Sequence, residues 1–251
     1  MNLNGKHIAI LVDNYFEQAE FEEPLSYLRD AGAEVTIIST GEHEVQGLNH
    51  AEKGDRFETD IILDDSSSGD YDALVLPGGA LNADHLRMND LAQQWVRDFL
   101  GSGRPLAVIC HAPWLLVSAD CIEGRRLTSY WTIQDDIRNA GGEWFNEPVV
   151  IDDNLITSRQ PDDIPQFNEA IAEMLNTRRT VATASAADLP ALGSEQELED
   201  ELRLRSLGYS PDRDELSKED IAELLSDDID ETPDEFNPSN IIPPEEDDGN
   251  D

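Results

Sequence analysis

The chain has 251 residues and is poor in the residue types that build several classes of protein. It contains two cysteines, Cys110 and Cys121, which are too few for the disulfide framework of a small secreted domain, and we expect no disulfide between them. No apolar run approaches the roughly 18 residues that a transmembrane helix needs. Residues 1–12 also lack the pattern of a secretory signal. We therefore expect a cytoplasmic protein that does not contact membranes.

Basic residues are scarce as well. Lysine and arginine together number 17, against 55 aspartates and glutamates, and the formal net charge is -38. Nucleic-acid binding is disfavoured by this charge, because neutralising phosphates requires clustered lysine and arginine. Residues 1–176 contain only two lysines, Lys6 and Lys53. Acidic, lysine-poor surfaces suit concentrated salt, so we hypothesise a high-salt cytoplasm.

The motifs of common cofactor sites are also missing. The sequence has no P-loop lysine, no G-x-G-x-x-G, no C-x-x-C and no H-E-x-x-H. We expect neither a nucleotide cofactor nor a metal ion.

Composition divides the chain near Thr177. Residues 1–176 hold 32 acidic and 11 basic residues and alternate between strand-like and helix-like patterns. Residues 177–193 are rich in threonine, alanine and serine and are expected to form a linker. Residues 194–251 have few aromatics and many acids, which predicts an acidic tail with one or two short helices and otherwise disorder.

The first part predicts an α/β fold. Its strand candidates are apolar throughout, as expected when helices cover both faces of a parallel sheet. Helical patterns separate them and close the domain from about Pro165 to Leu175. The predicted strands are His7–Val12, Val35–Ser39, Ala73–Leu76, Leu106–Ile109, Arg126–Ser129 and Val149–Ser158.

Chemically capable residues follow three of these strands. Ligands of parallel sheets bind at the carboxyl ends of the strands, so these positions are candidate site residues. Glu17 lies shortly after the first strand, Gly78 and Gly79 after the third, and Cys110 and His111 after the fourth.

Cys110 ends a buried strand and is followed by Pro113, which suits the first turn of a helix. A sulfur at such a turn faces the first amides of the helix, which lowers a thiol pKa. The alternative is a cysteine that acts as a small buried hydrophobe.

The neighbours of Cys110 have similar alternatives. His111 is either an imidazole partner of a thiolate or a solvent-facing residue at a helix start. Glu17 is either a protonated acid that donates to the sulfur or a solvated loop acid. Gly78 and Gly79 form either an oxyanion hole or a plain turn.

Taken together, these segments resemble the PfpI family of intracellular cysteine peptidases and deglycases, in the class I glutamine amidotransferase-like superfamily. The resemblance covers roughly residues 5–175, and nothing in it resembles residues 177–251. It is carried by residues 8–12, 16–21, 71–79, 108–111, 127–129, 139–141, 157–159 and 161–163.

The resemblance implies a flavodoxin-like three-layer sandwich with a mostly parallel sheet. It assigns the nucleophile to Cys110, the adjacent histidine to His111, the sulfur-bound carboxyl to Glu17 and the oxyanion amides to Gly78 or Gly79 and His111. In peptidase-like members an acid from a neighbouring subunit completes the triad, and the match here is Asp84. The site then exists only in a homo-oligomer, a dimer or hexamer. Two departures from the family pattern are Ala112, in place of a usual glycine, and Asp84, in place of a longer glutamate.

The implied activity is cysteine-dependent hydrolysis at an activated carbonyl without a cofactor. Members are described as peptidases, as deglycases that remove methylglyoxal or glyoxal adducts, as glyoxalases and as stress proteins. We favour a small carbonyl substrate or a glycated protein, because nothing indicates an extended peptide groove. Three aromatics either wall such a pocket or pack in the core: Trp114, Tyr130 and Trp131. The alternative is a non-catalytic redox sensor or chaperone-like protein in which Cys110 is oxidised.

Overall fold

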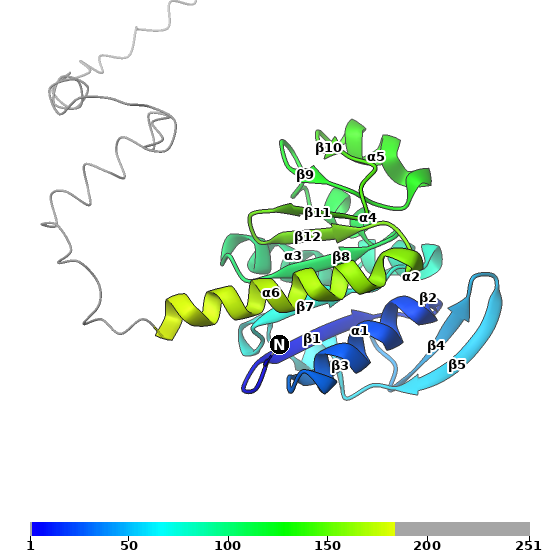
Figure 1. The fold of residues 1–251 in the computed structure, drawn as a ribbon. Coiled ribbons are helices and arrows are strands. Elements are labelled where there is room, and N and C mark those ends of the chain that lie inside the picture. Colours follow the sequence, from blue (N-terminus) through cyan, green and yellow to red (C-terminus); the bar gives the residue numbers. More distant parts are fainter. Residues whose placement is uncertain (1, 184–251) are drawn as a thin grey trace, which may run out of the picture. The chain divides into compact units, whose positions relative to one another are not determined.

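The computed structural model of the chain describes residues 2–183, with side chains as far as Thr177. Its centre is a seven-stranded sheet of order β11-β12-β8-β7-β1-β3-β6 (Figure 1). Every neighbouring pair is parallel except β11 with β12. The predicted α/β fold with a mostly parallel sheet is therefore confirmed. The strands are β1 (His7–Val12), β3 (Glu34–Ser39), β6 (Ile61–Ile62), β7 (Ala73–Leu76), β8 (Leu106–Ile109), β11 (Val149–Asp152) and β12 (Leu155–Ser158).

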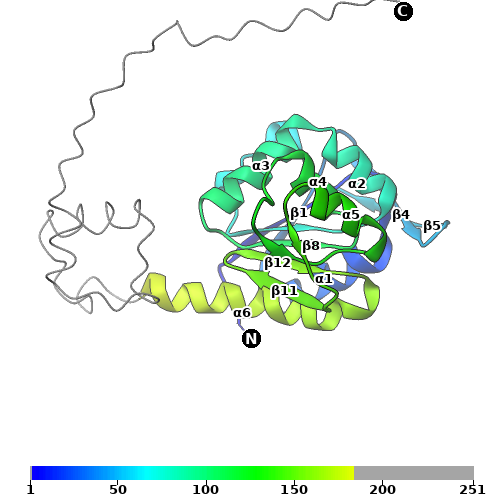
Figure 2. The same cartoon turned by 90° about the horizontal axis from the view of Figure 1, so that it is seen from above.

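Helices cover both faces of this sheet, giving three layers (Figure 2). Side chains alternate along a strand, and in β1 Ile10 packs into one core cluster while Leu11 packs into the other. Both are fully buried, which explains why the strands are apolar throughout. One layer contains α1 (Gln18–Asp30) and α6 (Ile164–Thr183), and the other contains α2 (Ala80–Arg87), α3 (Asp90–Gly101) and α4 (Pro113–Ser118), with α5 (Gln134–Asn139) beside α4.

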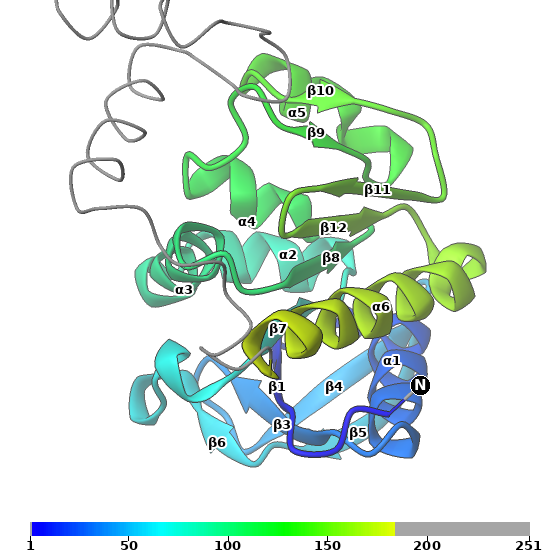
Figure 3. The same ribbon diagram turned by 60° about the vertical axis from the view of Figure 1, so that its left-hand side comes forward.

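Two small sheets flank the sandwich. The three-stranded sheet joins β2 (Phe16–Glu17) to the hairpin of β4 (Glu44–Asn49) and β5 (Glu52–Glu58), which projects at one end (Figure 1). The hairpin is attached through Phe57, whose ring contacts Phe16 and Phe21. The second small sheet pairs β9 (Arg126–Leu127) with β10 (Glu143–Trp144) and lies beside α5 (Figure 3). Four short 3-10 helices complete the described part, at Leu63–Asp65, Ser68–Asp70, Trp131–Ile133 and Pro161–Asp163.

Several predicted boundaries differ in the structure. The strand predicted at Val149–Ser158 is a hairpin, β11 and β12, which turns at Asp153 with φ 53°. The strand predicted at Arg126–Ser129 is shorter, because β9 ends at Leu127. Helix α6 continues to Thr183, seven residues into the segment expected to be a linker. The rest of that linker and the predicted tail helices lie outside the described residues.

No helix within residues 2–183 is long and apolar enough to cross a membrane.

Candidate active site

Cys110 occupies the sharp turn between β8 and α4. Its φ is 64°, in the left-handed region that non-glycine residues rarely adopt. Two backbone hydrogen bonds hold this conformation: the Cys110 amide donates to the Ser158 carbonyl at 3.1 Å, and the Tyr130 amide donates to the Cys110 carbonyl at 2.8 Å. The turn thus has a strained backbone at a single residue, which is common where a side chain has a chemical role.

Two glycines at the end of β7 allow the chain to pass close to this turn. A Cβ on Gly78 would collide with the Glu20 carboxyl and would lie 2.5 Å from the Cβ of Cys110. Gly79 has φ 90°, and a Cβ there would lie 2.7 Å from the Tyr15 carbonyl oxygen. Only glycine fits either position without rearrangement.

The carboxyl that contacts the Cys110 sulfur belongs to Glu20, not to Glu17. Glu20 lies in the first turn of α1 and is fully buried, and its Oε2 accepts a hydrogen bond from the Gly78 amide at 2.9 Å. The Glu17 carboxylate instead accepts from the His50 amide at 3.1 Å. The contact predicted for Glu17 was therefore wrong. Glu20 lies within the segment 16–21 that carries the resemblance, and the spacing of three residues is about one helical turn.

Burial governs the protonation of this pair. It raises the pKa of Glu20 from 4.5 to about 8, and the nearby Glu17 charge adds to the effect. Burial and the Glu20 charge also raise the pKa of the Cys110 thiol, so the lowered thiol pKa expected from the helix start was wrong. Ionising both of two buried acids that contact each other is energetically unfavourable, so the pair retains a proton at neutral pH. Held on Glu20, that proton lets the carboxyl donate to the sulfur.

His111 also contacts the sulfur. Its Nδ1 is 3.1 Å from Cys110 Sγ, and its Nε2 is 3.4 Å from the Thr132 hydroxyl. Its ring packs against Tyr130, with centroids 4.8 Å apart. Burial lowers the pKa of His111, which favours the neutral imidazole. A neutral ring beside a thiol can accept the thiol proton.

The amides predicted to form an oxyanion hole have different partners. The Gly79 and His111 amides donate towards the Cys110 sulfur. The Gly78 amide is already bound to Glu20, so its assignment to the oxyanion hole was wrong. Gly79 and His111 are the two amides that face a charge formed at or next to the sulfur.

Cys110 lies in a cleft of about 740 Å³ at the carboxyl ends of β1, β7 and β8. Of the three predicted aromatics only Tyr130 lines it; Trp114 donates to Asp136 at 2.8 Å, and Trp131 is 60% exposed. The cleft is lined by Tyr15, Glu17, Glu20, Leu48, His50, Ala51, Gly79, Ala80, Leu81, Cys110, His111, Tyr130, Gln160, Pro161 and Asp162.

Asp84 does not belong to this lining. It is exposed on α2, and within residues 2–183 of this one chain it has no contact with His111. The structure therefore brings together Cys110, His111, Glu17 and Gly79, and adds Glu20, but leaves Asp84 outside.

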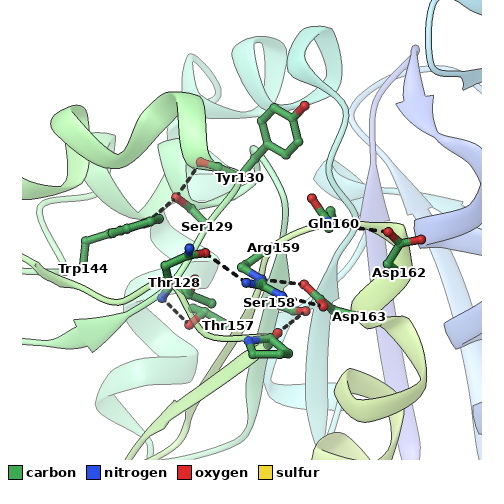
Figure 4. Close-up of polar contacts among 12 residues, drawn as sticks. Thr128, Ser129, Tyr130, Trp144, Thr157, Ser158, Arg159, Gln160, Asp162 and Asp163 are labelled. Atoms are coloured by element: carbon green, nitrogen blue, oxygen red, sulfur yellow. Dashed lines mark hydrogen bonds and ion pairs between the residues drawn. The ribbon is translucent and has the colours of Figure 1, made fainter.

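A polar network supports the wall that carries Tyr130 (Figure 4). The Thr128 amide donates to Thr157 Oγ1 at 2.9 Å, and the Trp144 indole donates to Ser129 Oγ at 3.0 Å. These bonds join the segment after β9 to β12 and to β10, and the last residue of β12, Ser158, also accepts from the Cys110 amide. Strand β12 therefore holds both the segment that carries Tyr130 and the nucleophile Cys110 in place.

Within residues 2–183, no three His, Cys, Asp or Glu side chains are grouped to hold a metal ion.

Comparison with known proteins agrees with this geometry. The sequence model of the DJ-1/PfpI family matches residues 6–174. The chain belongs to the DJ-1/PfpI family. Among the relatives of this family member is protein/nucleic acid deglycase 2 of Escherichia coli, 43% identical over 173 residues, which are 68% of this chain and 98% of the relative. Another is general stress protein 18 of Bacillus subtilis, 39% identical over 173 residues, with the same shares covered.

Solved structures of the family share the fold. Drosophila melanogaster DJ-1beta superposes with a TM-score of 0.63 at 29% identity, over 70% of this chain and 91% of that chain. A two-domain Anabaena variabilis protein with DJ-1/ThiJ/PfpI-like and ferritin-like domains has a TM-score of 0.64 at 31% identity. The alignment covers 68% of this chain and 48% of that longer protein.

Proposed function

We propose that the protein is a Cys110-dependent hydrolase that removes small dicarbonyl adducts, as a deglycase or glyoxalase. The observation that carries this proposal is the contact of one buried sulfur with two proton-transferring groups, Glu20 and His111, at the base of an open cleft. The name of the Escherichia coli relative supports the same class of reaction. A homo-oligomer in the cytoplasm remains our expectation.

The proposed reaction needs no external oxidant or reductant. The Cys110 thiolate adds to the aldehyde carbon of methylglyoxal and forms a C–S bond, while the carbonyl oxygen takes a proton and gives a hemithioacetal. The C1 proton then moves through an enediol to C2, which oxidises the aldehyde carbon to a thioester and reduces the ketone to an alcohol. Water cleaves the thioester, releasing a 2-hydroxy acid and the thiol. With an amine adduct, the thiolate replaces the amine at the hemiaminal carbon, the amine leaves with a proton, and the same hemithioacetal results.

The residues of the site suit these steps. Glu20 at a pKa of about 8 carries a proton at neutral pH and can exchange it with the substrate carbons and oxygens. The neutral His111 accepts the thiol proton. The Gly79 and His111 amides face the oxygen that becomes negative during addition.

The test is methylglyoxal consumption and 2-hydroxy acid formation by wild type and Cys110→Ala. Cys121→Ala is the matched control, because it removes a thiol that lies outside the cleft. We expect Cys110→Ala to abolish turnover and Cys121→Ala to retain it. Normal turnover by Cys110→Ala would end the proposal.

A second candidate is a redox sensor that uses the same sulfur. A protonated Glu20 can donate to an oxygen of a Cys110 sulfinate as readily as to the thiolate. Peroxide titration with mass spectrometry separates the two functions. Selective Cys110 oxidation in a protein that consumes no dicarbonyl would favour the sensor.

A further inference from the structure

The cleft around Cys110 is unusual in its charge. None of its lining residues is lysine or arginine, while Glu17 and Asp162 add two carboxylates to the lining. Glu17 comes from β2 and Asp162 from the 3-10 helix Pro161–Asp163, so the acids come from separate parts of the fold. With Glu20 protonated, these two carboxylates determine the charge of the cleft at neutral pH.

Cations close to the cleft are already paired. The Arg159 guanidinium donates to both carboxylate oxygens of Asp163, at 2.8 and 3.0 Å (Figure 4). It also donates to Asn146 Oδ1 at 2.9 Å. Of the two imidazoles in the lining, His111 is kept neutral by burial, which lowers its pKa. The other, His50, lies 3.8 Å from the Glu17 carboxylate, which offsets any charge it carries.

The base of the cleft adds no charge of its own at neutral pH. Glu20 Oε2 accepts from the Gly78 amide at 2.9 Å, which leaves Oε1 to carry the proton of a carboxyl that faces the Cys110 thiol. Oε1 is buried and has no other hydrogen-bond partner among the described residues. The charge of the cleft is therefore not set at its base.

We infer that the cleft selects substrates by charge, favouring dicarbonyl adducts on cationic or neutral groups, such as protein amines, over adducts on phosphate-bearing or other anionic groups. Glu17 and Asp162 are the specificity-determining residues. The inference rests on the proposed function for its substrate class. A cleft with this charge preference would distinguish the protein from a deglycase of nucleotides, whose substrates carry phosphates.

The size of the effect follows from electrostatic focusing. A cleft lined by charges of one sign changes the approach rate of charged molecules by about tenfold or more. Asp162 is exposed and Glu17 is partly exposed, so salt screens their charges and the preference should shrink at 1 M potassium chloride, where the Debye length is about 3 Å.

Charged thiol reagents test the charge selection directly, because their reaction with Cys110 does not require catalytic turnover of a substrate. Cys110 is labelled in a Cys121→Ala background with trimethylammonioethyl, ethyl and sulfonatoethyl methanethiosulfonates. In each case the thiolate attacks the sulfenyl sulfur, a mixed disulfide forms and methanesulfinate leaves. Rates are divided by those of the same reagents with 2-mercaptoethanol. We expect the corrected cationic rate to exceed the anionic rate by about tenfold.

Substitutions locate the cause. Glu17→Gln combined with Asp162→Asn should bring the ratio of the cationic to the anionic labelling rate to within about twofold of unity, because both carboxylates of the cleft lining lose their charge. The matched control is Glu143→Gln combined with Glu173→Gln, two exposed acids outside the cleft. It removes the same net charge and should leave the ratio unchanged. Circular dichroism checks that each variant is folded.

The outcomes separate the two proposals. A corrected ratio near one in the wild-type cleft, or an equal fall in the control, overturns the charge selection. Selective labelling without any methylglyoxal turnover removes the proposed function but retains the selection as a property of the site. Failure of every reagent to label Cys110 in the folded protein overturns both.

Discussion

The carboxyl of Glu20 and the thiol of Cys110 lie in contact at the base of the cleft, and both side chains are almost wholly buried. The Gly78 amide donates to the carboxyl, and His111 Nδ1 lies 3.1 Å from the sulfur. A proton held between two such acids is available to a carbonyl that enters the cleft. The predictions below follow from this arrangement and from the surface around it.

Replacing Glu20 by glutamine should reduce kcat/KM for methylglyoxal by about 10² to 10⁴, the usual contribution of a positioned acid or base. The amide keeps the shape and cannot exchange a proton. Glu23→Gln is the control on the same helix, since Glu23 is exposed. Glu17→Gln should cost at most about tenfold, because Glu17 does not contact the sulfur and acts only through its charge, which raises the pKa of Glu20. A larger loss for Glu17→Gln than for Glu20→Gln would restore Glu17 as the catalytic carboxyl.

The pH dependence of stability should change in the same variant. The pKa of Glu20 is raised from 4.5 to about 8, so between these values the folded protein keeps a proton that the unfolded chain has lost. The free energy of unfolding therefore falls as pH rises through this window, by up to about 1.4 kcal/mol per unit. Glu20→Gln removes this dependence. Urea denaturation at several pH values measures it, and parallel profiles for the two proteins would contradict the buried acid.

Gly78→Ala should damage both stability and activity. Its Cβ would collide with the Glu20 carboxyl and crowd Cys110, and overpacking of this kind costs about 1 to 3 kcal/mol. Gly101→Ala is a matched control, because a Cβ there meets no atom within 4 Å. Thermal melts should show a lower Tm for Gly78→Ala alone. Equal Tm values for the two variants would mean that the turn is not tightly packed.

Mixing two inactive variants tests the expected role of Asp84. If Asp84 of one subunit completes the site of another, then Cys110→Ala and Asp84→Asn form mixed oligomers with some intact sites. Activity should then appear after the two proteins are unfolded and refolded together, and not after each is refolded alone. An active Asp84→Asn protein would remove Asp84 from the site.

Salt should stabilise the protein. The net charge of -38 produces self-repulsion, and added salt screens it. We expect Tm to rise steadily from dilute buffer to molar potassium chloride. An equal or higher Tm in dilute buffer would exclude the hypothesis of a high-salt cytoplasm.

Much of the fold was predictable because its signals are local. The strands β1, β3, β7 and β8 are short apolar runs, and each lies within a residue of its predicted position. The turn at Cys110 was predictable for the same reason, since a buried strand leads directly to the cysteine and Pro113 comes three residues later.

The missed features depend on contacts between distant residues. Glu17 lies in β2, which pairs with β4 about 30 residues later in the chain. This pairing directs the Glu17 side chain, so the local sequence does not show that Glu20 contacts the sulfur in its place. The β4–β5 hairpin has an exposed, charged second strand with no clear alternation. Its attachment depends on Phe57 meeting Phe16 and Phe21, and Gln18 bonding to Asp55.

The strained backbone of Cys110 is held by Ser158 and Tyr130, which both come later in the chain than the cysteine itself. During synthesis the thiol therefore emerges from the ribosome well before the residues that fix its position. Until β12 has been added next to β8, the growing polypeptide has the sulfur but no site in which it can react.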